Sequence, residues 1–167
     1  MQARKWIITL TLVAAVAADA QMSTLVQQAK LVVKNIDGQT LTLGTQDLAK
    51  LPQLKTNAKD HDGKTNEYTG VRLRDVLTQA GIVTGMALRG KDMADYVVVD
   101  AADGYRVVFS LAELDPDIAN TQVIIAESMN GQPLGPKEGP LRLVVPEDKR
   151  PARWVRMVTS VSVLRAR

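Results

Sequence analysis

Residues 139–164 read GPLRLVVPEDKRPARWVRMVTSVSVL, and this stretch decides how the rest of the chain is interpreted. Apolar residues alternate over 141–145, and Pro146 ends that run. A second alternation, of valines separated by serine or threonine, covers 158–163. Between the two lies a polar, cationic segment. The pattern predicts a strand, a basic loop and a second strand.

The predicted loop concentrates positive charge around an aromatic side chain. Lys149, Arg150, Arg153 and Arg156 lie within one short segment that also holds Trp154. Strands on both sides would hold these cations in place, which favours an anion-binding pocket. A charge run is also typical of a solvated surface, and that alternative stays open. Trp154 favours the pocket, because an apolar ring beside guanidinium groups suits a planar ligand or a phosphate ester.

The first twenty residues are typical of a cleavable signal peptide. Arg4 and Lys5 precede an apolar run over 6–17, and Ala18-Asp19-Ala20 fits the small-x-small cleavage rule. The run is too short for an ordinary membrane span, although an uncleaved anchor is the alternative. We therefore expect a signal peptide over 1–20, one domain over 21–167, a periplasmic or secreted protein, and no membrane association after cleavage.

Composition excludes several classes of function. The formal net charge of +3 is too small to indicate nucleic-acid binding by bulk charge. The chain has no cysteine, which excludes disulfides, thiolate nucleophiles and thiolate metal ligands. An exported domain without disulfides depends on its hydrophobic core for stability.

Short strands dominate the rest of the chain. We expect hairpins around Asp37-Gly38 and Asp103-Gly104, because each pair separates two apolar runs. The polar segment 54–67 predicts either a long exposed loop or two ragged edge strands. Other expected elements are a helical turn over 45–48, a turn at Tyr68-Thr69-Gly70, a helix over 71–80 that Gly81 ends, and strands over 96–99, 105–109 and 122–126. This order indicates an α+β domain with mixed or antiparallel sheets and few short helices.

Some residues outside the basic loop could also carry chemistry. His61 lies between Asp60 and Asp62, but three adjacent side chains on a loop rarely converge on one metal ion, so a solvated loop is favoured. A hydrolase triad with His61 lacks a supporting motif such as G-x-S-x-G. Asp103 and Tyr105 are most simply interpreted as part of a hairpin turn. The alternative is that their carboxyl and phenol groups lie beside a pocket.

Three further charged residues are informative by position. Glu127 follows an apolar run, where exposure at a strand end is the commoner outcome. Arg72 and Arg74 flank the expected helix start, where a cation opposes the helix dipole. We therefore expect the two arginines to have another partner, either an acid or a ligand anion.

Three longer motifs and the basic loop together carry a resemblance. YTGVRLRDVLTQAGI at 68–82, DGYRVVFSLAEL at 103–114 and ESMNGQPLGPKEGPLRLVVP at 127–146 are followed by Arg153-Trp154. This order resembles the molybdopterin-binding domain of the sulfite oxidase family, over about residues 30–164. The resemblance implies the sulfite-oxidase-type fold with mixed sheets and few short helices.

The resemblance also implies a cofactor site, from which this chain departs. Family enzymes ligate molybdenum through a cysteine before the tyrosine-glycine-valine motif, and the corresponding segment 54–67 has none. His61 lies nearby but cannot supply a thiolate. Arg150 and Arg153 match the cations that hold the pterin phosphate. The candidate cofactor-binding residues are therefore Arg150, Arg153, Trp154, Asp103, Tyr105 and His61, with no catalytic and no metal-ligating residue assigned.

Three functions remain open at the level of sequence. The first is an exported protein that binds a pterin-like or other anionic ligand, or a protein partner, without molybdenum redox chemistry. The second is a molybdopterin-dependent oxidoreductase that retains its cofactor through other ligands or a partner chain. The third is a structural or interaction module whose basic loop is a solvated surface. In each case we expect Trp154 to be at least partly buried.

Overall fold

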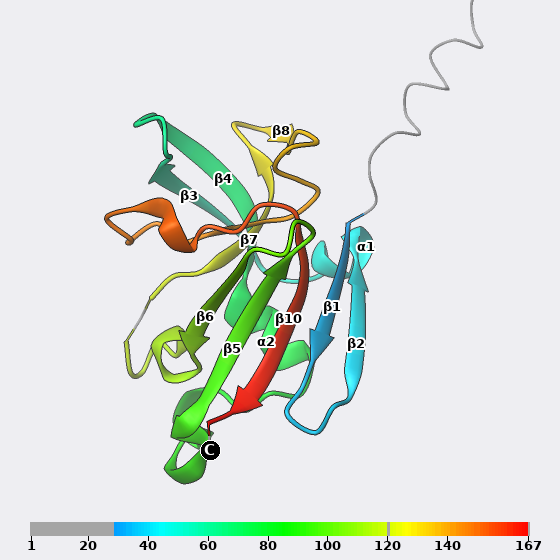
Figure 1. The fold of residues 1–167 in the computed structure, drawn as a ribbon, viewed down its shortest axis with the longest axis vertical. Coiled ribbons are helices and arrows are strands. Elements are labelled where there is room, and N and C mark those ends of the chain that lie inside the picture. The colour runs from blue at the N-terminus through cyan, green and yellow to red at the C-terminus, as the bar shows by residue number, and fades with distance from the viewer. Residues whose placement is uncertain (1–28, 120, 167) are drawn as a thin grey trace, which may run out of the picture.

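Two β-sheets packed around a shared core make up the computed structural model, which describes residues 29–119 and 121–166 (Figure 1). The first sheet has the strand order β2-β1-β10-β5-β6. The second has the order β3-β4-β7-β8, and β9 also pairs with β7. Short helices connect some of the strands. The expected α+β class is confirmed.

The first sheet brings the two ends of the described chain together. Its strands are β1 (Lys30–Lys34), β2 (Thr40–Gly44), β5 (Asp95–Ala101), β6 (Arg106–Ser110) and β10 (Val158–Arg165). β1 pairs parallel with β10, and the other neighbours are antiparallel. Both expected hairpins form. Gly38 and Gly104 adopt φ of +81° and +85°, values that an L-residue with a side chain rarely reaches.

The second sheet is antiparallel throughout. Its strands are β3 (Gln53–Lys59), β4 (Thr65–Arg72), β7 (Ile124–Met129), β8 (Gln132–Pro133) and β9 (Arg142–Val144). Of the two alternatives for residues 54–67, the pair of strands is therefore confirmed. Of these two strands only β3 lies at an edge of the sheet, because β4 pairs with both β3 and β7.

The turn predicted at Tyr68-Thr69-Gly70 is wrong, because these residues lie inside β4. Gly70 reflects a close approach of two backbones rather than a turn. A Cβ atom there would lie 2.0 Å from the carbonyl oxygen of Ile125 on β7. A glycine inside a strand often marks such a contact. As a result β4 continues to Arg72, and the predicted helix starts two residues later than expected.

The helices are short and lie in the segments that connect the strands. They are α1 (Thr45–Leu48), α2 (Leu73–Gln79), η2 (Gly85–Ala87), η3 (Gly90–Ala94), η4 (Ala112–Leu114) and η5 (Pro151–Arg153). The start of α2 is anchored to the second sheet, since Leu73 N donates to Val123 O at 2.8 Å. Gly81 follows α2 with φ of +75°, as the helix-stop prediction requires.

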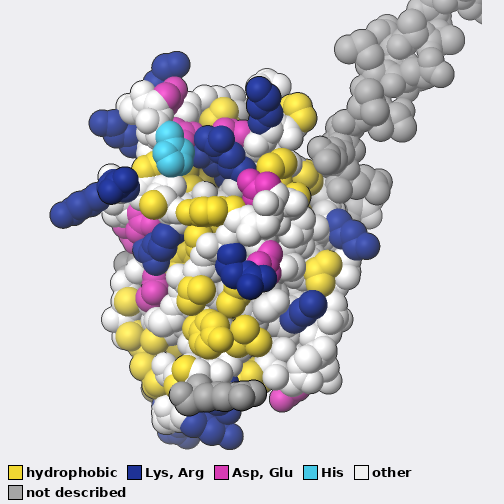
Figure 2. All heavy atoms as spheres, in the orientation of Figure 1, with side chains coloured by type: hydrophobic (Ala, Val, Ile, Leu, Met, Phe, Trp, Pro, Cys, Tyr) yellow, Lys and Arg dark blue, Asp and Glu magenta, His cyan; other side chains and the backbone are white. Residues whose placement is uncertain are grey.

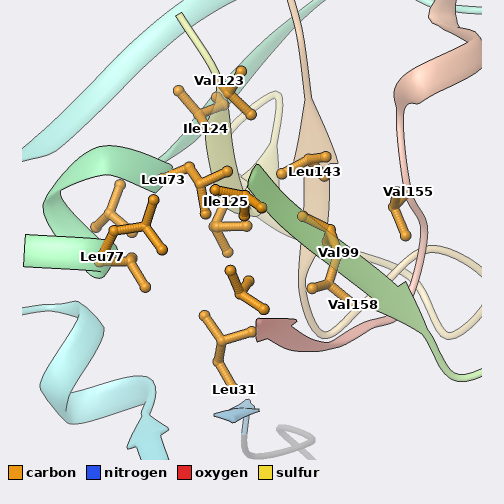
Figure 3. Close-up of a cluster of buried hydrophobic side chains, with 14 of the residues drawn as sticks. Leu31, Leu73, Leu77, Val99, Val123, Ile124, Ile125, Leu143, Val155 and Val158 are labelled. Atoms are coloured by element: carbon orange, nitrogen blue, oxygen red, sulfur yellow. The ribbon is translucent and has the colours of Figure 1, made fainter. Parts of the chain in front are cut away.

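One hydrophobic core joins both sheets and α2. Figure 3 shows Leu73 and Leu77 of α2 facing Ile125 of β7, Val99 of β5 and Leu31 of β1. All five side chains are fully buried. Each buried aliphatic side chain of this size contributes roughly 1.5–3 kcal/mol relative to exposure. The cysteine-free domain therefore has the continuous core that its composition demands.

The basic loop forms as expected between β9 and β10, with η5 in its middle. The predicted signal peptide lies outside the described residues. No helix within the described ranges is long and apolar enough to cross a bilayer.

Candidate functional site

Three connecting segments come together at one end of the fold. They are the β3–β4 turn (60–64), the β5–β6 turn (102–105) and the basic loop (146–157). Tyr105 Oη donates to Ala152 O at 2.5 Å, and Ala102 N donates to Met157 O at 2.9 Å. These two bonds tie the β5–β6 turn to the basic loop. The paired strands behind each segment hold the site on a rigid base.

The larger of two adjoining hollows has a volume of about 400 Å³. Its wall holds four basic side chains and two carboxylates. The lining residues are Lys59, Asp60, His61, Gly63, Pro146, Asp148, Lys149, Arg150, Pro151 and Ala152. The β3–β4 turn and the basic loop therefore line one shared hollow.

The smaller hollow, of about 200 Å³, continues from the larger one past His61, Pro151 and Ala152, which line both. Its other lining residues are Asp103, Tyr105, Trp154 and Arg156. Figure 2 shows the single histidine of the chain, in cyan, among Lys and Arg side chains on this face. The smaller hollow has the more apolar wall of the two.

Most of the predicted site residues meet at these hollows. Arg150 lines the larger one, His61 lines both, and Asp103, Tyr105 and Trp154 line the smaller one. Sequence alone could not show that the turn with His61 and the turn with Asp103 lie beside the same loop.

Arg153 is not brought to either hollow, contrary to the expectation that it forms a pocket with Arg150. Its Nε and Nη2 donate to Asp148 at 2.9 and 2.7 Å, and its Nη1 donates to Glu113 at 2.7 Å. The guanidinium also lies 4.6 Å from the ring centre of Phe109. Hydrogen bonds to Asp148 and then Glu113 raise its pKa despite partial burial. Arg153 thus stabilises the basic loop through these hydrogen bonds and does not line a hollow.

Trp154 is only 5% exposed, so the expectation that it is at least partly buried is confirmed. Its Nε1 donates to Val145 O at 2.9 Å. The ring packs edge-on against Tyr68 at 5.6 Å, and the guanidinium of Arg142 lies 5.2 Å from its centre. The cation beside the indole therefore comes from β9 and not from the basic loop, and only a small part of the ring reaches the hollow.

Arg142 is the site residue that the sequence analysis missed. Its side chain is fully buried. Nη2 donates to Asp60 Oδ1 at 2.9 Å, and Nη1 donates to Glu138 and, at 3.3 Å, to Tyr68 Oη. Tyr68 Oη in turn donates to Asp60 Oδ2 at 2.8 Å. The available signal was a cation inside the apolar run 141–145, because a buried charge requires a partner.

This network fixes the charge of the β3–β4 turn. Burial alone raises the pKa of Asp60, but hydrogen bonds from Arg142, His61 N and Tyr68 outweigh it and lower the pKa to about 2. Burial and the hydrogen bond to Asp60 raise the pKa of Tyr68, so its hydroxyl stays protonated. Asp60 is therefore a carboxylate whose charge is balanced from inside the protein.

Both acids of the larger hollow are balanced in this way, Asp60 by Arg142 and Asp148 by Arg153. The outer cations Lys59, Lys149 and Arg150 form no ion pair with any described residue. The hollow consequently keeps a net positive charge, which suits an anion held by charge-assisted hydrogen bonds.

The same site does not fit a thiolate-ligated molybdenum centre. The segment in which the resemblance places the ligating cysteine forms β3, its turn and the start of β4, and the chain has no cysteine. Its donors there are amines, carboxylates and the imidazole of His61. Within 29–119 and 121–166, no three His, Asp or Glu side chains gather as a metal-binding group.

Comparison with known proteins agrees with this architecture. The crystal structure of the sulfane dehydrogenase SoxCD from Paracoccus pantotrophus matches with a TM-score of 0.63 and 20% identity, over 81% of this chain and 38% of the SoxCD chain. At that identity the match shows the fold alone, and this chain spans less than half of the SoxCD chain. No curated protein sequence matches. The sequence pattern of the oxidoreductase molybdopterin-binding domain matches residues 55–167, and the chain belongs to that family.

Proposed function

We propose that this domain binds a small anionic ligand at the two adjoining hollows, without molybdenum redox chemistry. A phosphate-bearing compound such as a pterin phosphate is the class of ligand that the site suits. The phosphate would lie against Lys149 and Arg150 in the larger hollow. A flat ring would extend toward Tyr105 in the smaller one.

The observation that carries this proposal is the separation of paired and unpaired cations. Arg142, which is fully buried, and Arg153, which is partly exposed, balance the acids Asp60 and Asp148. Lys149 and Arg150 are exposed and line the same hollow as those acids. A solvated surface would not require the fully buried Arg142 to balance the charge of Asp60. A preorganised anion site benefits from such a residue, because it leaves the exposed cations free to bind the anion.

The donors of the site support the part of the proposal that excludes molybdenum chemistry. A thiolate is the ligand that the family resemblance demands, and no residue of this chain can supply it. The alternative function is a molybdopterin-dependent oxidoreductase that retains the metal through other contacts or a partner chain. Elemental analysis of protein purified from its native compartment separates the two. Stoichiometric molybdenum would overturn this part of the proposal.

Anion binding is tested by thermal unfolding and calorimetry at physiological salt, with inorganic phosphate and pyrophosphate as probes. A ligand that binds only the folded state raises the unfolding temperature. Lys149→Ala/Arg150→Ala should weaken binding at least about tenfold, since a hydrogen bond to a charged group is worth roughly 1.5–3 kcal/mol. The matched control is Lys30→Ala/Lys34→Ala, two exposed cations of β1. Equal weakening by both pairs would mean a solvated charged surface and would favour the interaction module.

The proposal also places this protein outside the cytoplasm. Its support is the order of basic residues, apolar run and Ala-Asp-Ala at the N-terminus. An exported ligand-binding domain would meet its anion, or a partner that carries it, in the periplasm or outside the cell.

A further inference from the structure

A further hollow, with two arginines in its wall, lies apart from the site described above. It has a volume of about 230 Å³, and its wall includes Arg72, Arg74, Leu114, Pro116, Gln122 and Val123. It shares no lining residue with the two hollows at the basic loop. Its residues come from the end of β4, the start of α2, η4 and the segment before β7.

The local fold holds the two arginines beside each other. They flank Leu73, which is fully buried and whose N–H donates to Val123 O at 2.8 Å. Figure 3 shows Leu73 close to Val123 and Ile124. Because Leu73 is anchored in the core, Arg72 and Arg74 emerge on either side of it at the rim of the hollow. Their side chains are 37% and 27% exposed.

Neither guanidinium donates a hydrogen bond to a residue of 29–119 or 121–166. Asp75 is the acid nearest to both, at 3.9 Å from Arg72 Nη1 and 3.6 Å from Arg74 Nε. These distances are too long for hydrogen bonds. Elsewhere in the described chain, Arg142, Arg153 and Arg165 donate to carboxylates at 2.9 Å or less. The guanidinium N–H groups of Arg72 and Arg74 are therefore available to donate hydrogen bonds to a ligand.

The carboxylate of Asp75 also lacks part of its hydrogen bonding. Its Oδ2 is buried and has no hydrogen-bond partner among the described residues. One carboxylate thus faces two guanidinium groups, which leaves a local charge of +1. A loosely held acid between two cations is easily displaced from them by a better-placed anion.

We infer that this hollow is a second binding site, for a small organic carboxylate. A carboxylate matches the planar fork of a guanidinium and can accept two parallel hydrogen bonds from it. Leu114, Pro116 and Val123 provide an apolar wall for a short hydrocarbon body. The hollow is smaller than the roughly 300–1,000 Å³ of pockets for drug-sized ligands, so the carboxylate must be small. Gln122 supplies a polar side chain at the rim.

The test uses calorimetric titration of the full chain with acetate, butyrate and sulfate, with ionic strength held constant by chloride. Saturable butyrate binding, tighter than acetate because its methylenes meet the apolar wall, is the expected result. Arg72→Gln/Arg74→Gln should weaken butyrate binding at least about tenfold, the factor that corresponds to 1.4 kcal/mol. Arg89→Gln/Lys91→Gln, two exposed cations without an ion pair in the described residues, is the matched control and should not change it.

A second variant keeps the inference falsifiable if loss of the arginines impairs folding. Asp75→Asn preserves shape but removes the competing charge, so butyrate should bind severalfold tighter. A purely structural ion pair predicts lower stability and no gain in affinity. Lys149→Ala/Arg150→Ala separates this site from the proposed phosphate site, because it should leave butyrate binding intact. Absence of saturable binding, equal loss in the Arg89/Lys91 control, or preference for sulfate over butyrate would overturn the carboxylate site.

Discussion

Arg142 shows how a single buried residue can set the charge of a surface. Its guanidinium balances Asp60 and Glu138, and it packs against the rings of Tyr68 and Trp154. A buried ion pair is not necessarily stabilising in comparison with apolar residues of the same size. Arg142 instead affects the charge of the larger hollow. Because the Asp60 carboxylate is paired with Arg142, it does not neutralise the cations that line the hollow beside it.

Replacing Arg142 by methionine should strongly destabilise the domain. The substitution keeps most of the side-chain volume but leaves the carboxylates of Asp60 and Glu138 without their buried partner. Breaking such a pair typically costs about 3–5 kcal/mol. Urea unfolding at neutral pH measures the change. The control is Arg106→Met, which removes an ion pair whose arginine is 65% exposed and should cost less than about 1 kcal/mol.

The same variant carries a pH signature. The folded-state pKa of Asp60 is about 2, below its ordinary value of 3.8. A depressed pKa contributes stability that is complete above the ordinary value and is lost as pH falls through the folded-state value. The difference in unfolding free energy between wild type and Arg142→Met should therefore narrow between about pH 4 and pH 2. A difference that stays constant over this window would show that Arg142 acts by packing alone.

At the scale of elements, the second sheet depends on the contact between β4 and β7 at Gly70. The ladder shifts register between Thr69 and Gly70, and a Cβ at Gly70 would lie 2.6 Å from Ala126 Cα. Both obstructing groups are backbone atoms, which cannot swing aside as a side chain can. The close approach therefore requires glycine.

Gly70→Ala should accordingly cost more than the ~1–3 kcal/mol typical of overpacked core side chains. Amide hydrogen exchange should show loss of protection along β4 and β7 first, with the first sheet less affected. Gly135→Ala is the matched control, because a Cβ there meets no atom within 4 Å. Comparable unfolding temperatures for the two variants would refute the close-contact explanation.

The elements that sequence could predict are those with local causes. Asp37-Gly38 and Asp103-Gly104 specify their hairpins through turn chemistry within a few residues. Gly70 was misinterpreted because its cause lies on β7, far along the chain. The Arg142 network was missed for the same reason, since its hydrogen bonds to Tyr68 and Asp60 span 74 and 82 positions. Glu127 was expected to be exposed but is half-buried, and burial raises its pKa.

At the scale of the whole molecule, the core and the candidate site lie at different places in the fold. The hydrophobic cluster joins both sheets and α2, whereas the β3–β4 turn, the β5–β6 turn and the basic loop gather beyond the strand ends (Figure 1). Most residues of the hollows lie outside the core, but Trp154 belongs to both, so its replacement would disturb the core. This arrangement is compatible with the proposed anion site in a member of this family that has no cysteine.

The last prediction concerns where this molecule is found. The N-terminal pattern predicts cleavage after Ala20, so that the mature chain begins at Gln21 and lies in the periplasm of a Gram-negative cell or outside the cell. N-terminal sequencing of protein from the extracytoplasmic fraction measures this directly. Ala20→Phe should block processing, because the cleavage rule requires a small residue there. Asp19→Ala changes the unconstrained middle position and should be processed normally. Recovery of a membrane-bound chain that still begins at Met1 would instead support the uncleaved anchor.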